Sequence, residues 1–98
     1  MKLWSTKTAD RKIREWIYKR DNYQCVFCGR KQSDGWRMNP SHFWGRRASA
    51  LRFDPKNVDT ACTVCHIKME PNKEGFYRTW KIKQLGESGY KELEKRFY

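Results

Sequence analysis

Apolar positions recur at helical spacing in the first part of the chain. Four of them share one face of a helix expected over residues 9–20, namely Ala9, Ile13, Trp16 and Ile17. Thr8 stands just before this segment and is its expected N-cap, since a hydroxyl there can accept a free backbone N–H. We expect the apolar stripe to pack into the core of the domain.

Two extended segments are expected in the middle of the chain, on either side of an arginine-rich loop. Residues 36–43 form the first predicted strand, and residues 57–61 form a second strand that returns antiparallel to it. Thr63 is the expected cap of a short helix that Pro71 ends, because proline cannot continue a helix. Strand, loop, strand and helix together predict a ββα unit.

The remainder of the chain predicts two further helices. The first is expected from Asn72 to about Leu85, and residues 86–89, which include two glycines, form the turn that separates it from the second. The residues expected to face inward are Phe76, Tyr77 and Trp80 in the first helix and Tyr90, Leu93 and Phe97 in the second. The pattern therefore predicts one small α+β domain over residues 1–98.

Composition adds two constraints to this picture. A chain of 98 residues with 38% hydrophobic residues buries only a thin core, so it needs a staple such as a metal or disulfides. The formal net charge of +11, from 22 basic and 11 acidic residues, favours a nucleic-acid partner. A membrane partner is not expected, because the basic residues are spread out and no apolar run has membrane-spanning length.

The cysteines supply the expected staple. They form two Cys-x-x-Cys pairs, Cys25/Cys28 and Cys62/Cys65, which together offer enough thiolates for a tetrahedral structural Zn²⁺ site. Disulfides are the competing interpretation. Because no signal peptide is recognisable, we expect a cytoplasmic protein, in which thiols stay reduced and hold zinc. The zinc would then clamp the two ends of the ββα unit.

The order of cysteine, histidine and asparagine residues resembles that of zinc-bound HNH endonucleases, also called ββα-metal or His-Me finger nucleases. His42 and Asn57 lie between the cysteine pairs, and His66 follows the last cysteine directly. A narrower resemblance, to phage NinG-type (Rap) recombination nucleases, covers about residues 9–95. It is carried by Ser41-His42-Phe43-Trp44, Arg46, Leu51-Arg52-Phe53-Asp54, Asn57 and Cys62-Thr63-Val64-Cys65. The resemblance implies a single HNH endonuclease domain, phage-encoded or bacterial, in the host cell.

The resemblance also implies roles for three residues. His42 would be the general base, because a neutral imidazole near pH 7 can take a proton from water. Asn57 would hydrogen-bond the loop backbone and hold that base in register. His66 would bind a catalytic Mg²⁺ or Mn²⁺ that acts as a Lewis acid. The alternatives are structural roles for the histidines, a zinc ligand at His66 and a turn cap at Asn57.

One position departs from the HNH pattern. Many HNH nucleases carry an acidic metal ligand immediately before the base histidine, and this chain has Ser41 there. A hydroxyl is a poorer ligand for Mg²⁺ than a carboxylate, so water, a DNA phosphate, Glu70 or Asp59 would have to complete the site. A site with one imidazole suits Mn²⁺ or another transition ion at least as well as Mg²⁺.

Arginines around the loop are the expected DNA contacts. They are Arg46, Arg47 and Arg52, with Arg37 nearby in sequence. Guanidinium groups bind phosphates well, although a solvated loop is the alternative for any single one. Because no base-reading element is recognisable, we expect backbone contacts with weak sequence preference.

The expected function is that of a metal-dependent DNA endonuclease acting on branched or recombination-intermediate DNA. One alternative is a phage-type HNH nickase that acts in DNA packaging. Another is a catalytically inactive, zinc-dependent DNA-binding module. Cutting both strands of a symmetric junction would need two active sites, which favours a homodimer.

Overall fold

The computed structural model describes residues 5–45 and 51–97 of the chain. Its helices and strands follow in the order α1 (Thr6–Arg20), β1 (Met38–His42), β2 (Val58–Cys62), α2 (Thr63–Met69) and α3 (Phe76–Phe97). The two strands form an antiparallel sheet in which Met38 lies opposite Cys62 and His42 lies opposite Val58. The predicted α+β class and antiparallel hairpin are therefore confirmed.

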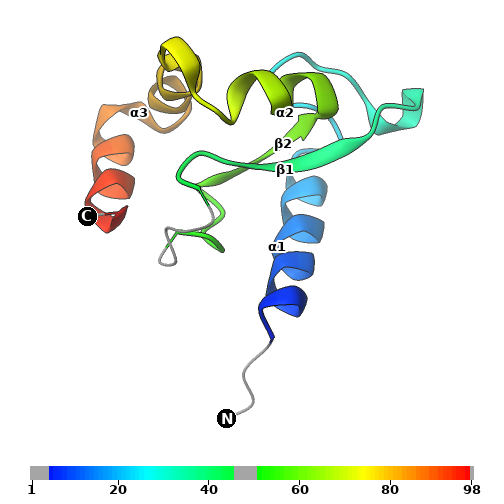
Figure 1. Cartoon of the computed structure of the whole chain (residues 1–98), viewed down its shortest axis with the longest axis horizontal. Coiled ribbons are helices and arrows are strands. Elements are labelled where there is room, and N and C mark those ends of the chain that lie inside the picture. Colours follow the sequence, from blue (N-terminus) through cyan, green and yellow to red (C-terminus); the bar gives the residue numbers. More distant parts are fainter. Residues whose placement is uncertain (1–4, 46–50, 98) are drawn as a thin grey trace.

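The hairpin lies at the centre of the molecule. Helices α1 and α2 both contact the two strands, and Figure 1 shows them on opposite sides of the hairpin. Helix α3 lies beyond α2 and changes direction part of the way along its length (Figure 1). The core between these elements includes Met38, Phe43, Ala61, Met69, Tyr77 and Tyr90.

Helix α1 differs from the expectation at its start and in its burial. Ser5, and not Thr8, is the N-cap, because the Ser5 hydroxyl oxygen accepts a hydrogen bond of 3.2 Å from the Thr8 backbone N–H. The helix ends at Arg20, as predicted. Ile17 is fully buried, but Trp16 is 53% exposed, so the expectation that the whole stripe enters the core was wrong. A sheet of only two strands is too narrow to cover the stripe along its full width.

The start of α2 also differs from the expectation. Cys62, and not Thr63, is the N-cap, and its sulfur accepts a hydrogen bond of 3.5 Å from the Cys65 backbone N–H. Because Cys62 is at the same time the last residue of β2, strand and helix follow each other without a loop. This direct junction brings the second cysteine pair to the end of the hairpin.

The C-terminal region, α3, consists of two helical segments that meet at a kink, as the sequence predicted. Helix α3 begins at Phe76 rather than at Asn72, because Asn72 and Glu74 have left-handed φ angles of 54° and 59°. A turn was predicted over residues 86–89, but the helical geometry is interrupted only at Gly86. Its φ of 76° and ψ of 162° are angles that only glycine adopts readily. Phe76 is 49% exposed, against the expectation that it faces inward, whereas Tyr77 is fully buried.

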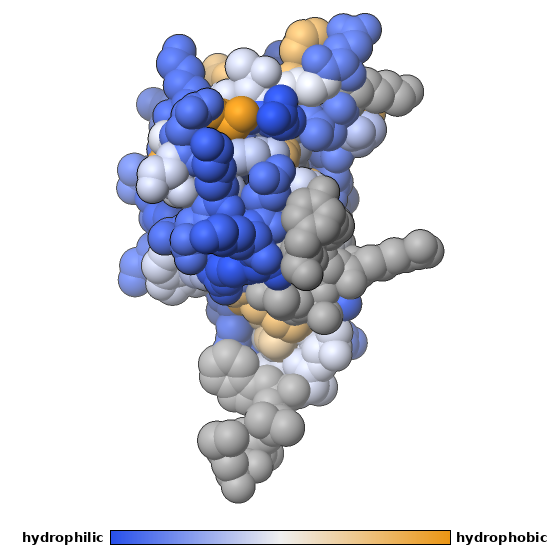
Figure 2. Space-filling view, turned by 90° about the vertical axis from the view of Figure 1, so that its left-hand side faces the viewer, coloured by the Kyte–Doolittle hydropathy of each residue, from blue (hydrophilic) through white to orange (hydrophobic). Residues whose placement is uncertain are grey.

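The surface around α3 is polar. Figure 2 shows that hydrophilic side chains cover most of this face and that the hydrophobic ones are scattered. Among the described residues, no helix combines the length and the apolar character needed to cross a membrane.

Candidate functional site

The two cysteine pairs converge on one point. Their four Sγ atoms all lie within 4.8 Å of one another, and the Sγ atoms of Cys28 and Cys62 are 3.7 Å apart. All four are free thiols. Tetrahedral zinc, with Zn–S bonds of about 2.3 Å, requires sulfurs roughly 3.8 Å apart. The cluster has this size, so the four cysteines could hold a metal such as zinc.

Local backbone structure explains why the first pair points inward. Gly29 has a φ of 85°, and its N–H donates to the Cys25 carbonyl at 3.0 Å. The Cys25 N–H donates in turn to the Arg30 carbonyl at 2.8 Å, which closes a tight knuckle. The Val26 N–H donates to the Thr60 carbonyl at 3.0 Å and fixes the knuckle to β2. The first pair is thereby held beside the second.

The electrostatics of the cluster favour ionisation at its exposed member. Burial opposes ionisation of Cys28, but hydrogen bonds from the Arg30 backbone and from the neighbouring thiols lower its pKa to about 6. Burial raises the pKa of Cys25 and of Cys65. The Arg30 side chain donates to the Cys28 sulfur at 3.2 Å, and the same nitrogen lies 3.7 Å from the Cys62 sulfur. This cation can offset the negative charge of the thiolates, the form that binds metals.

His66 lies in α2, directly after the last cysteine. Its Nε2 contacts the carboxylate of Glu70 one helical turn later, and both side chains are about one-third exposed. Within residues 5–45 and 51–97, the four cysteines are the only group of at least three His, Cys, Asp or Glu side chains close enough to hold an ion. A cation at His66 and Glu70 would therefore need water or substrate oxygens as further ligands.

His42 is the last residue of β1. Its side chain is only 2% exposed, so a substrate phosphate reaches the imidazole only if neighbouring side chains move. The next residue continues the ladder, because the Phe43 N–H donates to the Asn57 carbonyl at 2.9 Å. Alternation along the strand places Ser41, and not His42, on the face shared with Asp59. The structure thus places His42 and His66 on different elements.

The Asn57 side chain forms hydrogen bonds with the backbone on both sides of the loop between the strands. Its buried side-chain oxygen accepts a hydrogen bond of 2.8 Å from the Trp44 N–H. Its amide nitrogen donates to the carbonyls of Trp44 at 2.9 Å and of Leu51 at 3.1 Å. Asn57 therefore makes hydrogen bonds to the loop backbone, and a role for it in a reaction stays a prediction.

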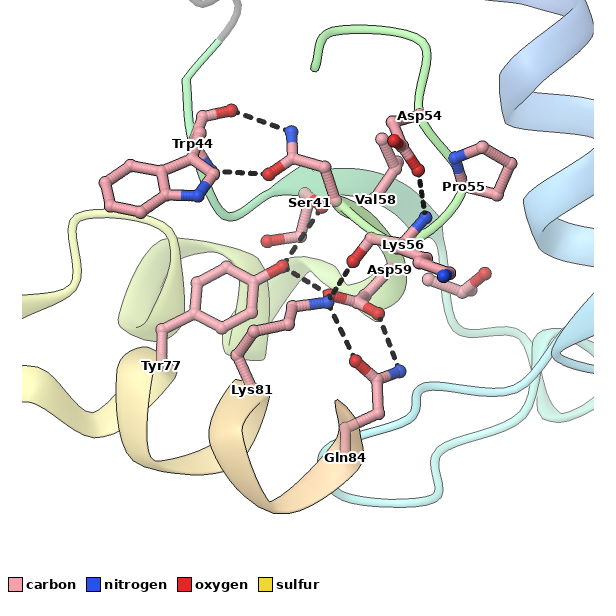
Figure 3. Close-up of polar contacts among 12 residues, drawn as sticks. Ser41, Trp44, Asp54, Pro55, Lys56, Val58, Asp59, Tyr77, Lys81 and Gln84 are labelled. Atoms are coloured by element: carbon pink, nitrogen blue, oxygen red, sulfur yellow. Dashed lines mark hydrogen bonds and ion pairs between the residues drawn. The ribbon is translucent and has the colours of Figure 1, made fainter. Parts of the chain in front are cut away.

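A buried polar network joins α3 to the face of the hairpin on which Ser41 and Asp59 lie. The Tyr77 hydroxyl, which has one proton to share, lies 2.7 Å from Asp59 Oδ2 and 3.1 Å from the Ser41 carbonyl oxygen (Figure 3). The Ser41 hydroxyl is itself buried and has no hydrogen-bond partner among the described residues. Burial, and then the charge of Asp59, raise the pKa of Tyr77 well above its ordinary value. The tyrosine therefore remains a donor at any working pH.

Lys81 completes this network. Its ammonium group donates to Asp59 Oδ2 at 2.7 Å, to the Lys56 carbonyl at 2.8 Å and to Gln84 Oε1 at 2.8 Å (Figure 3). All three of its donors are satisfied, which a buried ammonium group requires. Burial lowers the pKa of Lys81, and the Asp59 charge opposes that shift. Gln84 closes the ring with a hydrogen bond of 3.2 Å to Asp59 Oδ1.

This network changes the choice of metal ligands. Asp59 was a candidate replacement for the acid absent at Ser41, but it is fully buried and its carboxylate already accepts from Tyr77 and Lys81. Of the two carboxylates considered, Asp59 is therefore bound to α3, whereas Glu70 lies beside His66. Sequence reasoning missed Lys81 and Gln84. The available signal was their spacing from Tyr77, which places all three residues on one face of a helix.

The predicted DNA-binding arginines have different surroundings. Arg46 and Arg47 lie outside the described residues. Arg52 forms a two-pronged ion pair with Asp10 of α1, with distances of 3.1 and 2.6 Å. Arg37 is exposed. DNA binding by these residues stays a prediction, and Arg52 has a structural partner that would compete with a phosphate.

Comparison with known proteins gave one kind of match. The family model described as Bacteriophage Lambda NinG protein matches residues 2–97 of the chain. Neither the curated proteins nor the solved structures gave a match. The matched range includes all four cysteines, both histidines and Asn57.

Proposed function

This chain belongs to the bacteriophage lambda NinG protein family, and on that basis we propose that it is a metal-dependent DNA endonuclease of the HNH type that acts on branched recombination intermediates. One observation carries the proposal. Asn57 bonds the backbone on both flanks of the loop that follows His42. A fully buried amide that fixes the backbone next to a histidine is the arrangement that a positioned general base needs.

In the proposed reaction, His42 takes a proton from water while the water oxygen attacks the phosphorus atom. The bond from phosphorus to the 3′ oxygen breaks, and this oxygen takes a proton from solvent. The products are a 5′-phosphate and a 3′-hydroxyl. His66 and Glu70 would hold Mg²⁺ or Mn²⁺, which stabilises negative charge on the leaving oxygen when bound.

The proposed partner is the DNA backbone. A net charge of +11 favours binding to phosphates whatever the base sequence, with an affinity that falls as salt rises. The exposed Arg37 and the loop arginines Arg46, Arg47 and Arg52 are the proposed contacts. A homodimer would supply two active sites for cutting both strands of a junction.

A zinc-dependent DNA-binding module without catalysis is the second candidate. It is favoured by the absence, among the described residues, of a second group of three metal-ligating side chains. Nicking of supercoiled plasmid with Mg²⁺ or Mn²⁺ separates the enzyme from this module. Faster cutting of a four-way junction than of a linear duplex of equal length separates a junction nuclease from a general nickase, including one that acts in packaging.

The first test replaces the proposed base. We expect His42→Ala to lower plasmid nicking by on the order of a hundredfold or more, because the attacking water would lose its proposed general base. Zinc content and DNA affinity should stay at wild-type levels, and added imidazole should restore part of the rate. If His42→Ala nicks DNA at the wild-type rate, His42 is not the base and the proposed mechanism is wrong.

The second test concerns the cation. We expect His66→Ala to lose nicking at low Mn²⁺ and to recover part of it as Mn²⁺ is raised, because the substitution weakens cation binding. Ile67→Ala, at an exposed position on the same helix, is the matched control and should behave like the wild type. A loss in His66→Ala that no Mn²⁺ concentration reduces would show that His66 is not a cation ligand.

A further inference from the structure

Helix α3 binds the backbone immediately before the first candidate catalytic residue. The Tyr77 hydroxyl lies 3.1 Å from the carbonyl oxygen of Ser41, and Ser41 directly precedes His42 in β1. The tyrosine is fully buried, with its ring packed against Phe43 at a centroid distance of 5.1 Å. One side chain of α3 thus contacts the backbone just before His42 and the side chain just after it.

The same helix binds the backbone before the second candidate residue. Lys81 lies one turn after Tyr77 and donates from its ammonium group to the carbonyl oxygen of Lys56 at 2.8 Å. Lys56 directly precedes Asn57, whose side chain ties the two flanks of the loop. Figure 3 shows Tyr77 and Lys81 extending side by side from α3 toward the hairpin.

A single carboxylate oxygen joins the two donors. Asp59 Oδ2 lies 2.7 Å from the Tyr77 hydroxyl and 2.7 Å from Lys81 Nζ. Asp59 stands opposite Ser41 in the sheet, so the three side chains and the two strands form one connected unit. All three residues are 0% exposed, and hydrogen bonds to charged groups are strong in such surroundings.

We propose that Tyr77 and Lys81 are positioning residues: they fix the backbone directly before His42 and Asn57, and so set the orientation of the candidate base. A two-stranded sheet is only marginally stable by itself, so its ends need such external contacts. A displacement of about 1 Å at a reacting group can cost on the order of a hundredfold in rate. The catalytic consequence rests on the proposed function, whereas the positioning of His42 does not.

The test removes one hydroxyl at a time from the two tyrosines that bind carbonyls of β1. Tyr77→Phe loses the contact with the Ser41 carbonyl beside His42, together with the hydrogen bond to Asp59. Tyr18→Phe is the matched control, because the Tyr18 hydroxyl donates to the Met38 carbonyl at 2.9 Å, at the other end of the strand. We expect Tyr77→Phe to lower kcat roughly tenfold or more while KM for junction DNA changes less than about twofold. Tyr18→Phe should keep kcat within about twofold of the wild type.

A second measurement does not depend on cleavage. The chain has two histidines, so the imidazole resonances of His42 and His66 can be assigned and followed by NMR. The His42 resonances should shift in Tyr77→Phe and stay in place in Tyr18→Phe. If they shift although the wild-type protein cuts no DNA, the nuclease proposal fails and the positioning role stands. If Tyr77→Phe matches Tyr18→Phe in the His42 resonances, the inference is overturned.

Discussion

Removal of zinc from the cysteine cluster is expected to unfold the whole domain. Structural zinc sites contribute apparent binding energies of about 10–16 kcal/mol, as much as the stability of a typical domain, about 5–15 kcal/mol. The cluster here joins the knuckle around Cys25 to the junction of β2 and α2 at Cys62. Few other contacts can replace that connection in so small a core.

The measurement combines metal analysis with circular dichroism. Purified protein should contain about one zinc per chain, lose its helical signal with a strong chelator and recover it when zinc is returned. Cys28→Ser should weaken zinc binding, whereas Ser33→Ala, at an exposed position nearby, should not. A metal-free protein that keeps its fold, or disulfides at Cys25 and Cys62, would contradict the prediction.

The second large effect is expected at the buried ion pair. Lys81→Met should lower the free energy of unfolding by about 3–5 kcal/mol, because it removes the cation that lies 2.7 Å from the buried Asp59 carboxylate and leaves only the more distant Arg20, at 3.8 Å. The Lys56 carbonyl also loses its donor. Lys83→Met, at an exposed position on the same helix, should change the stability by less than about 0.5 kcal/mol.

Urea unfolding at a fixed zinc concentration measures these differences. The double variant Asp59→Asn with Lys81→Met should be more stable than the sum of its two single effects predicts, because it leaves no unpaired charge in the core. A loss below about 1 kcal/mol in Lys81→Met would show that the Lys81–Asp59 pair does not stabilise the domain as proposed.

The features that sequence reasoning predicted correctly depend on local patterns. Helical spacing predicted α1, and the paired Cys-x-x-Cys motifs predicted a cluster that the structure assembles. The errors involve contacts between distant segments. The exposure of Trp16 depends on how far a narrow sheet extends over α1, and the pairing of Asp59 with Lys81 joins β2 to α3. Neither can be deduced from spacing along one segment.

The N-cap of α1 shows a different limit. Ser5 and Thr8 both carry a hydroxyl that can cap a helix, and the hydroxyl of Ser5 also donates to that of Thr8 at 3.0 Å. Composition cannot choose between two equivalent caps three residues apart. For the site, the family resemblance identified Asn57 as a residue that binds the loop backbone, whereas the contacts of Lys81 and Gln84 with Asp59 came only from the structure.

The hairpin is held at both of its ends. The cysteine cluster lies at the end where Met38 pairs with Cys62, and Asn57 closes the other end beside His42. A free β-ribbon frays from its ends inward, one pair of residues at a time. Because both ends are fixed, the residue pairs cannot separate one at a time from an end, so the ribbon opens cooperatively with the rest of the domain. The two short strands are therefore expected to separate only when the whole domain unfolds.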